Sequence, residues 1–187
     1  WRFADENYGY VFLGSNNSRK FSFTLGYVYG KSEEHTIDYT KYVFRLNYQP
    51  FDAFSMSLDT EFEKVIDKTQ YVTQQSFNNV ARYILGEINN QTLSTTLRLN
   101  YSINPNFSIQ FYGQPFISRG RYTNFNFVNN PTEASFYQRV NLYNNNQITK
   151  NNNTFLIDEN INGTTDYSFS NPDFSKTLSK TNSPQFP

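Results

Sequence analysis

One polar segment of this 187-residue chain has the oxygen side chains and the spacing of a calcium-binding loop. Its side chains at positions 1, 3, 5 and 9 carry oxygen, and Gly163 at position 6 permits a sharp turn. Position 12 is Phe169, where an EF-hand needs a bidentate Glu, so the sequence favours a plain Asn/Gly turn. If calcium binds, we expect weak binding that orders a surface loop, with these ligands: Asp158, Asn160, Asn162 and Asp166.

Three acidic residues on one predicted strand, Asp59, Glu61 and Glu63, have the types of paired catalytic carboxylates. A general acid needs surroundings that separate its pKa from that of its partner, whereas Lys41 is expected opposite Glu61 in a watery barrel lumen, so we expect the three carboxylates to set the electrostatics of that lumen. His35 lies in a charged turn without a nearby nucleophile, which indicates a solvated residue. We therefore predict no catalytic residue and no enzymatic activity, and the absence of Cys also excludes thiolate chemistry.

The composition excludes several further classes of protein. The 16 Lys and Arg balance the 16 Asp and Glu, so the basic excess of a nucleic-acid binder is missing. The mean hydropathy is −0.70, and no run of about 18 apolar residues predicts a membrane helix, although the alternating strands of a membrane barrel remain compatible. The chain begins at Trp1 rather than Met, so we expect a mature fragment or an excised piece.

The aromatic residues, 19% of the chain, are expected on strands, and the 26 Asn residues in turns. In Phe21–Tyr29 every odd position is large and apolar, a period of two that predicts a strand. Weaker patterns at Tyr71–Phe77 and Val80–Ile88 predict two separate strands around an Asn-Asn turn. Further alternating runs, typical of antiparallel strands with one apolar face, cover 42–48, 54–63, 93–103 and 107–112.

An internal repeat predicts how these strands pair. Arg45-Leu46-Asn47-Tyr48 recurs 53 positions later as Arg98-Leu99-Asn100-Tyr101, and each copy is followed after five residues by a similar alternating run. The same hairpin is therefore expected twice. Matching the apolar faces across each turn places Tyr48 opposite Phe54, and Tyr101 opposite Phe107.

Such strands suit a soluble β-sandwich or a transmembrane β-barrel. Strands of about 10 to 13 residues, aromatic residues at strand ends, and tight turns beside one long polar stretch favour the barrel. We predict an all-β fold, an antiparallel transmembrane β-barrel or part of one. Residues 1–117 should form its strands and short turns, 118–175 a long Asn-rich extracellular loop, and 176–187 a disordered tail.

Several separated blocks resemble the barrel part of the family called domain of unknown function 5916, which consists of Bacteroidota-type outer-membrane proteins. The resemblance implies an outer-membrane barrel, often preceded by a carbohydrate-binding-like sandwich that this chain lacks, and some members carry hydrolase labels. After Phe174 the chain also departs from the family pattern, which continues with further strands. The blocks are Leu97-Arg98-Leu99-Asn100-Tyr101, Gln110-Phe111-Tyr112-Gly113-Gln114-Pro115-Phe116, Gly120-Arg121-Tyr122, Ile157-Asp158-Glu159-Asn160, Gly163, Asp166-Tyr167-Ser168-Phe169 and Asn171-Pro172-Asp173-Phe174.

We therefore expect a noncatalytic segment of a larger envelope protein in the bacterial outer membrane, linked to glycan binding, transport or assembly. Its expected partners are outer-membrane lipid and either the remaining barrel strands or other outer-membrane proteins, without nucleic acid and without a cofactor other than calcium. The alternatives are a soluble carbohydrate-binding β-sandwich and a hydrolase. At most eight strands can be counted, and the first, near Tyr8–Leu13, is shorter than a span requires, so this chain alone should not seal a barrel.

Overall fold

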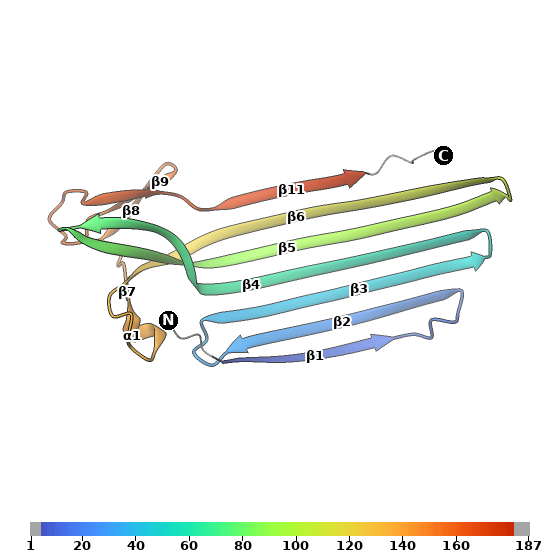
Figure 1. Cartoon of the computed structure of the whole chain (residues 1–187), viewed down its shortest axis with the longest axis horizontal. Helices are drawn as coiled ribbons and strands as arrows, with labels where there is room; N and C mark the ends of the chain where they lie inside the picture. The colour runs from blue at the N-terminus through green and yellow to red at the C-terminus, as the bar shows by residue number, and fades with distance from the viewer. Residues whose placement is uncertain (1–4, 182–187) are drawn as a thin grey trace.

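The alternating segments form one large antiparallel sheet, in which strands that follow each other in sequence lie side by side (Figure 1). The computed structural model describes the backbone of residues 5–181 and the side chains of residues 5–175. The sheet has the order β1-β2-β3-β4-β5-β6-β11, with β7 paired to β6, and a second sheet has the order β10-β9-β8. The elements are β1 (Glu6–Gly14), β2 (Phe21–Ser32), β3 (Ile37–Phe51), β4 (Phe54–Phe77), β5 (Val80–Asn104), β6 (Phe107–Val128), α1 (Phe136–Arg139), β7 (Val140–Leu142), β8 (Ile148–Asn151), β9 (Thr154–Ile157), β10 (Tyr167–Ser170) and β11 (Phe174–Thr181).

The period of two predicted from the sequence is also the period of burial along β2. In β2, rings such as Phe21 and Tyr27 are exposed, whereas the intervening small residues Ser22 and Gly26 are buried. Successive side chains of a strand point to opposite faces, so one face collects the large apolar residues and the other the small and polar ones. The prediction of an all-β, antiparallel fold is confirmed; the described residues contain one helix, the four-residue α1.

The two weakly patterned segments at 71–77 and 80–88 are strands, but they are not separate ones. They continue β4 and β5, which reach 24 and 25 residues and form a hairpin that projects beyond β3 (Figure 1). Asn78 and Asn79 make its turn with φ of 50° and 62°, a conformation that Asn tolerates better than most residues. The first strand is also longer than expected, nine residues at Glu6–Gly14.

The predicted hairpin registers are wrong by two residues. Tyr48 pairs with Met56 rather than Phe54, because Phe51 pairs with Phe54 and a bulge follows Tyr48. A shift of two residues leaves every side chain on its predicted face, since the pleat repeats every two residues. The second hairpin is shifted equally: Tyr101 pairs with Ile109, and Leu99 with Phe111.

Residues 118–175, expected as a long loop, contain much regular structure. Strand β6 continues to Val128, and residues 129–173, called the lobe below, form α1 and β7 to β10. The lobe packs on the projecting ends of β5 and β6, and strand β11 covers part of the expected tail, of which residues 182–187 lie outside the described residues. The buried cluster beneath the lobe contains Ile84, Phe125, Phe127, Tyr143, Phe155, Ile157, Tyr167 and Phe169.

The large sheet is open. Its outermost strands are β1 and β11, and within residues 5–181 they do not pair with each other (Figure 1). These residues therefore form a sheet that is not closed into a barrel. In the same part of the chain, no helix has the length and apolar character needed to cross a membrane.

Candidate functional site

Five neighbouring strands, β2 to β6, present one uncharged face to the outside. The strand pairing aligns a stretch of nine residues from each of the five strands, and in each of these stretches every second side chain, the one on this face, is uncharged. Many of its side chains are exposed, such as Tyr42 and Leu25 at 53% and 46%, and those of β4 are half-buried. We call this surface the apolar face, and it consists of every second residue in 21–29, 40–48, 54–62, 93–101 and 109–117.

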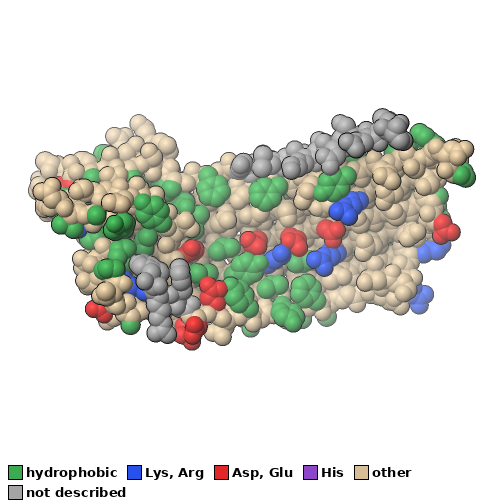
Figure 2. Space-filling model, viewed as in Figure 1, with side chains coloured by type: hydrophobic (Ala, Val, Ile, Leu, Met, Phe, Trp, Pro, Cys, Tyr) green, Lys and Arg blue, Asp and Glu red, His purple; other side chains and the backbone are tan. Residues whose placement is uncertain are grey.

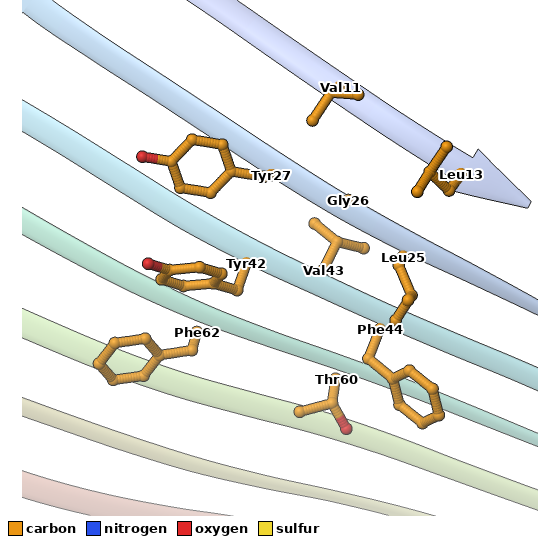
Figure 3. A pocket seen from close by; sticks show the side chains of 10 residues that line it. All are labelled: Val11, Leu13, Leu25, Gly26, Tyr27, Tyr42, Val43, Phe44, Thr60 and Phe62. Atoms are coloured by element: carbon orange, nitrogen blue, oxygen red, sulfur yellow. The ribbon is translucent and has the colours of Figure 1, made fainter.

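Aromatic rings lie in rows across the apolar face. At the end with the short turns, successive ring centroids are 6.5, 6.5 and 6.2 Å apart along the row Phe21, Tyr48, Phe54 and Tyr101. A second row, six residues away along β2 and β3, contains Tyr27, Tyr42 and Phe62, with centroids 5.3 and 6.4 Å apart. Figure 3 shows this second row on three neighbouring strands.

Between the rows the apolar face is mostly aliphatic, with Phe23 and Phe44 among its residues, and it is slightly hollowed. Leu25, Phe44 and Thr60 line a groove of about 390 Å³ together with the second row of rings (Figure 3). The Oγ1 atoms of Thr60 and Thr95 are 3.3 Å apart and hydrogen-bond to each other. These two hydroxyls therefore satisfy each other across neighbouring strands.

The opposite face of the same strands carries ion pairs. Lys41 Nζ lies 2.7 Å from Glu61 Oε2, and Arg45 Nε lies 3.4 Å from Asp59 Oδ1. Figure 2 shows basic and acidic side chains gathered along the middle of one face of the sheet. The register places Lys41 opposite Glu63, so the predicted contact with Glu61 forms diagonally.

The acidic trio, Asp59, Glu61 and Glu63, which the sequence predicted to set the electrostatics of a lumen, lies together on this face. Asp59 and Glu61 contact cations, and Glu63 accepts a hydrogen bond of 3.0 Å from the Tyr39 hydroxyl. His35 is in the turn between β2 and β3, with φ of 52°. Each carboxylate of the trio therefore has a structural partner.

The four residues predicted to bind calcium lie in one loop between β9 and β10. The Asp158 carboxylate accepts hydrogen bonds from the backbone N–H groups of Asn162 (3.0 Å) and Gly163 (2.7 Å). Gly163 has φ of +86°, the sharp turn that the spacing predicts. Asn160 Oδ1 and Asp166 Oδ2 likewise accept backbone N–H groups. The oxygens of these side chains thus accept backbone N–H groups within the loop, Asn160 in an Asx turn, and calcium binding stays a prediction.

Sequence reasoning missed a buried polar network beneath the lobe. Arg82, on β5, forms a two-pronged pair with Glu159, with Nε–Oε1 of 3.0 Å, Nε–Oε2 of 3.1 Å and Nη2–Oε1 of 2.9 Å. Tyr167 donates to Glu159 Oε2 at 2.7 Å, and its oxygen lies 2.7 Å from that of Tyr143. The guanidinium also lies 5.0 Å from the centre of the Phe127 ring. This network joins the lobe to the projecting hairpin.

The network shifts the pKa values of its members. Burial raises the pKa of the Tyr167 and Tyr143 hydroxyls well above the ordinary value of 10.0. The hydrogen bonds to Glu159 raise the pKa of the Arg82 guanidinium. Both tyrosines are therefore neutral donors, and Arg82 is a permanent cation, throughout the physiological pH range.

These tyrosines should make the lobe sensitive to alkaline pH. Below about pH 10 both tyrosines are protonated in the folded and in the unfolded chain, and their contribution to stability is complete. It is lost as the pH rises toward their pKa values in the folded state, because the unfolded chain releases these protons first. We expect the unfolding free energy to fall between about pH 10 and about pH 11, and the fall to be shallower in Tyr167→Phe. Denaturant titrations followed by circular dichroism measure it, with the exposed-ring variant Tyr83→Phe as the control, which should keep the wild-type slope.

Comparison with known proteins gives one family. A family model described as "Domain of unknown function (DUF5916)" matches residues 2–170, which include strands β1 to β10. No curated protein and no solved structure matches the chain. The match therefore covers both the large sheet and the lobe.

Proposed function

We propose that this chain, which belongs to the DUF5916 family, is a noncatalytic segment of a β-barrel in the bacterial outer membrane. The observation that carries the proposal is the apolar face: over aligned stretches of nine residues, five strands present only uncharged side chains on one side, whereas β3 and β4 carry ion pairs on the other. In a membrane barrel the outward face meets lipid and the polar face lines the interior. The proposed partner of the apolar face is outer-membrane lipid.

The dimensions of the apolar face support this proposal. Nine residues extend roughly 30 Å at about 3.3 Å per residue. A strand tilt of about 40° reduces this to roughly 23 Å, close to the apolar band of about 25 Å around outer-membrane barrels. The aromatic rows resemble the girdles that such barrels place at the membrane interfaces.

The alternative of a soluble β-sandwich needs a second layer over the apolar face. The second sheet, β8 to β10, instead packs through Phe155 and Phe169 on the projecting ends of β5 and β6, against Ile84 and Phe125. On the apolar face, the side chains of β2 and most of those of β6 remain exposed, and those of β4 are half-buried. This arrangement favours the membrane proposal over a carbohydrate-binding sandwich.

The outermost strands suggest what else the segment contacts. An unpaired backbone group in lipid costs several kcal/mol, so the free edges of β1 and β11 are expected to pair with further strands. These strands are proposed to come from the rest of the same barrel or from another outer-membrane protein. The proposed role is then structural, in transport, in assembly or in a surface function linked to glycans, with the lobe outside the cell and the short turns on the periplasmic side.

Membrane fractionation tests the proposal. When the chain is produced with an export signal in a Gram-negative host, we expect it in the outer-membrane fraction, extracted by detergent and not by alkaline carbonate or urea. The reason is the large uncharged surface, which contacts lipid favourably and water poorly. A monodisperse chain that stays soluble without detergent would contradict the proposal and support the sandwich.

A further inference from the structure

A row of cations borders the apolar face at the end that carries the lobe. Lys64 follows Phe62 by two residues on β4, and Arg119 follows Ile117 by two on β6, so both lie on the same face as the apolar residues. The strand pairing aligns Lys64 with Gln91, and Gln91 with Arg119. Arg121 lies two residues further along β6 on the same face. We call Lys64, Arg119 and Arg121 the basic row.

The basic row is compact. Neighbouring strands are about 4.8 Å apart, so the Cα atoms of Lys64 and Arg119 are separated by roughly 10 Å, and those of Arg119 and Arg121 by roughly 7 Å. All three side chains are long enough to approach one anion between them. Arg119 and Arg121 are exposed, and Lys64 is half-buried.

The basic row differs from Lys41 and Arg45 on the opposite face in having no carboxylate partner among the described residues. Within the described residues no acidic oxygen lies within 4.0 Å of its three cationic groups, whereas Lys41 and Arg45 are both in ion pairs. Asp173, close to Arg121 in the paired strands, uses Oδ1 to accept the Tyr122 backbone N–H at 2.6 Å. The positive charge of the row is therefore not compensated by a salt bridge.

On the basis of the proposed membrane function, we infer that the basic row binds the phosphate groups of anionic lipid headgroups in the leaflet on the lobe side. Arg presents several N–H donors in a planar fork that matches phosphate oxygens, and Lys supplies a point charge. Clusters of cations beside a membrane-spanning segment attract anionic lipids, and the attraction decays within a Debye length of the surface.

The position of the row supports a lipid rather than a free phosphate ion. The row begins two residues beyond the apolar face, at the height where the headgroup of a lipid lying against Phe62 and Ile117 would be. A lipid gains binding free energy from both the apolar contact and the ion pairing, whereas inorganic phosphate gains it only from the ion pairing.

Vesicle binding of the whole chain tests the inference. One set of vesicles contains phosphatidylcholine alone, and the other contains phosphatidic acid as roughly one lipid in five. We expect the chain to bind the second set at least about 10-fold more tightly, because each cation near the surface contributes roughly fivefold. The triple variant Lys64→Gln, Arg119→Gln, Arg121→Gln should lose this preference and still enter phosphatidylcholine.

A charge-matched control separates the row from net charge. Lys41→Gln, Arg45→Gln, Arg98→Gln removes the same charge from the opposite face and should keep the preference. If the triple variant of the row enters neither set of vesicles, the charge-preserving variant Arg119→Lys, Arg121→Lys is measured instead. We expect this variant to insert and to keep a reduced preference for phosphatidic acid. A preference that is lost completely, or one that equals that of the wild-type chain, would overturn the inference.

The remaining outcomes distinguish the inference from the function beneath it. Equal binding of the wild-type chain to both vesicle sets would overturn the inference and leave the membrane function standing. Binding to neither set would contradict the proposed function itself. Abolition of the preference by inorganic phosphate would assign the row to a free anion and overturn the lipid assignment.

Discussion

Replacing Leu97 with Arg should lower the free energy of unfolding from the membrane by about 2 to 4 kcal/mol. Leu97 is the central residue of the stretch 93–101 on the apolar face, and its pair on β4 is Leu58. At that depth a guanidinium has no water and no acidic partner, and the cost of a cation on the lipid face is greatest at the midplane. Denaturant unfolding of the chain refolded in phosphatidylcholine vesicles measures the change.

The matched control is the preceding residue of the same strand. Thr96 points to the opposite face and pairs with Asp59, so Thr96→Arg places its guanidinium beside a carboxylate. We expect a change of about 1 kcal/mol or less, typical of a partly exposed ion pair. Similar losses in the two variants would show that neither face is a lipid face, and a larger loss in Thr96→Arg would reverse the assignment of the faces.

Replacing Glu159 with Gln should destabilise the lobe by about 3 to 5 kcal/mol. The side chains of Arg82 and Glu159 are only 18% and 10% exposed, and the substitution leaves the guanidinium buried without a counter-charge. Tyr167 also loses its ionised acceptor. Hydrogen exchange of the amides in β9 and β10 measures the effect, and the amides of β2 and β3 serve as an internal reference that should not change.

Two further variants identify the cause of that loss. Glu133→Gln removes a carboxylate from an exposed position of the lobe and should leave exchange unchanged. The double variant Arg82→Met, Glu159→Leu removes both charges and should be more stable than Glu159→Gln, because an unpaired buried charge costs more than the absent pair. If the double variant loses as much stability as the single variants Arg82→Met and Glu159→Leu lose together, the two residues do not act as a pair.

The sheet could be predicted from sequence because its signal is local. Alternation in Phe21–Tyr29 identifies both the strand and its faces, since burial in β2 follows the same period. The register could not be obtained in the same way. Matching the apolar faces leaves registers that differ by two residues equally acceptable. The bulge after Tyr48 selects among them, and it does not change the alternation of the sequence.

The lobe was missed because its order comes from distant residues. Strands β8 to β10 have four residues each, too few for a period to be recognised. Their side chains contact residues far away in the sequence. The ring centres of Phe155 and Phe125 are 4.6 Å apart, and Arg82 pairs with Glu159, 77 residues later. A single sequence contains no local signal for such contacts, whereas the calcium-type spacing, which is local, correctly predicts the sharp turn at Gly163.

The way in which the lobe joins the sheet has an evolutionary consequence. Strand β6 stays paired with β5 almost to its end at Val128, and β11 returns beside β6 where Phe174 pairs with Gly120, so the lobe, residues 129–173, is one excursion from one end of the sheet. Insertions, deletions or the exchange of this whole excursion can then alter what the protein presents at one end without changing the order of its strands. Selection on surface recognition and selection on sheet stability act on separable parts of the chain, a division that lets the exposed end diversify rapidly while the sheet stays constant.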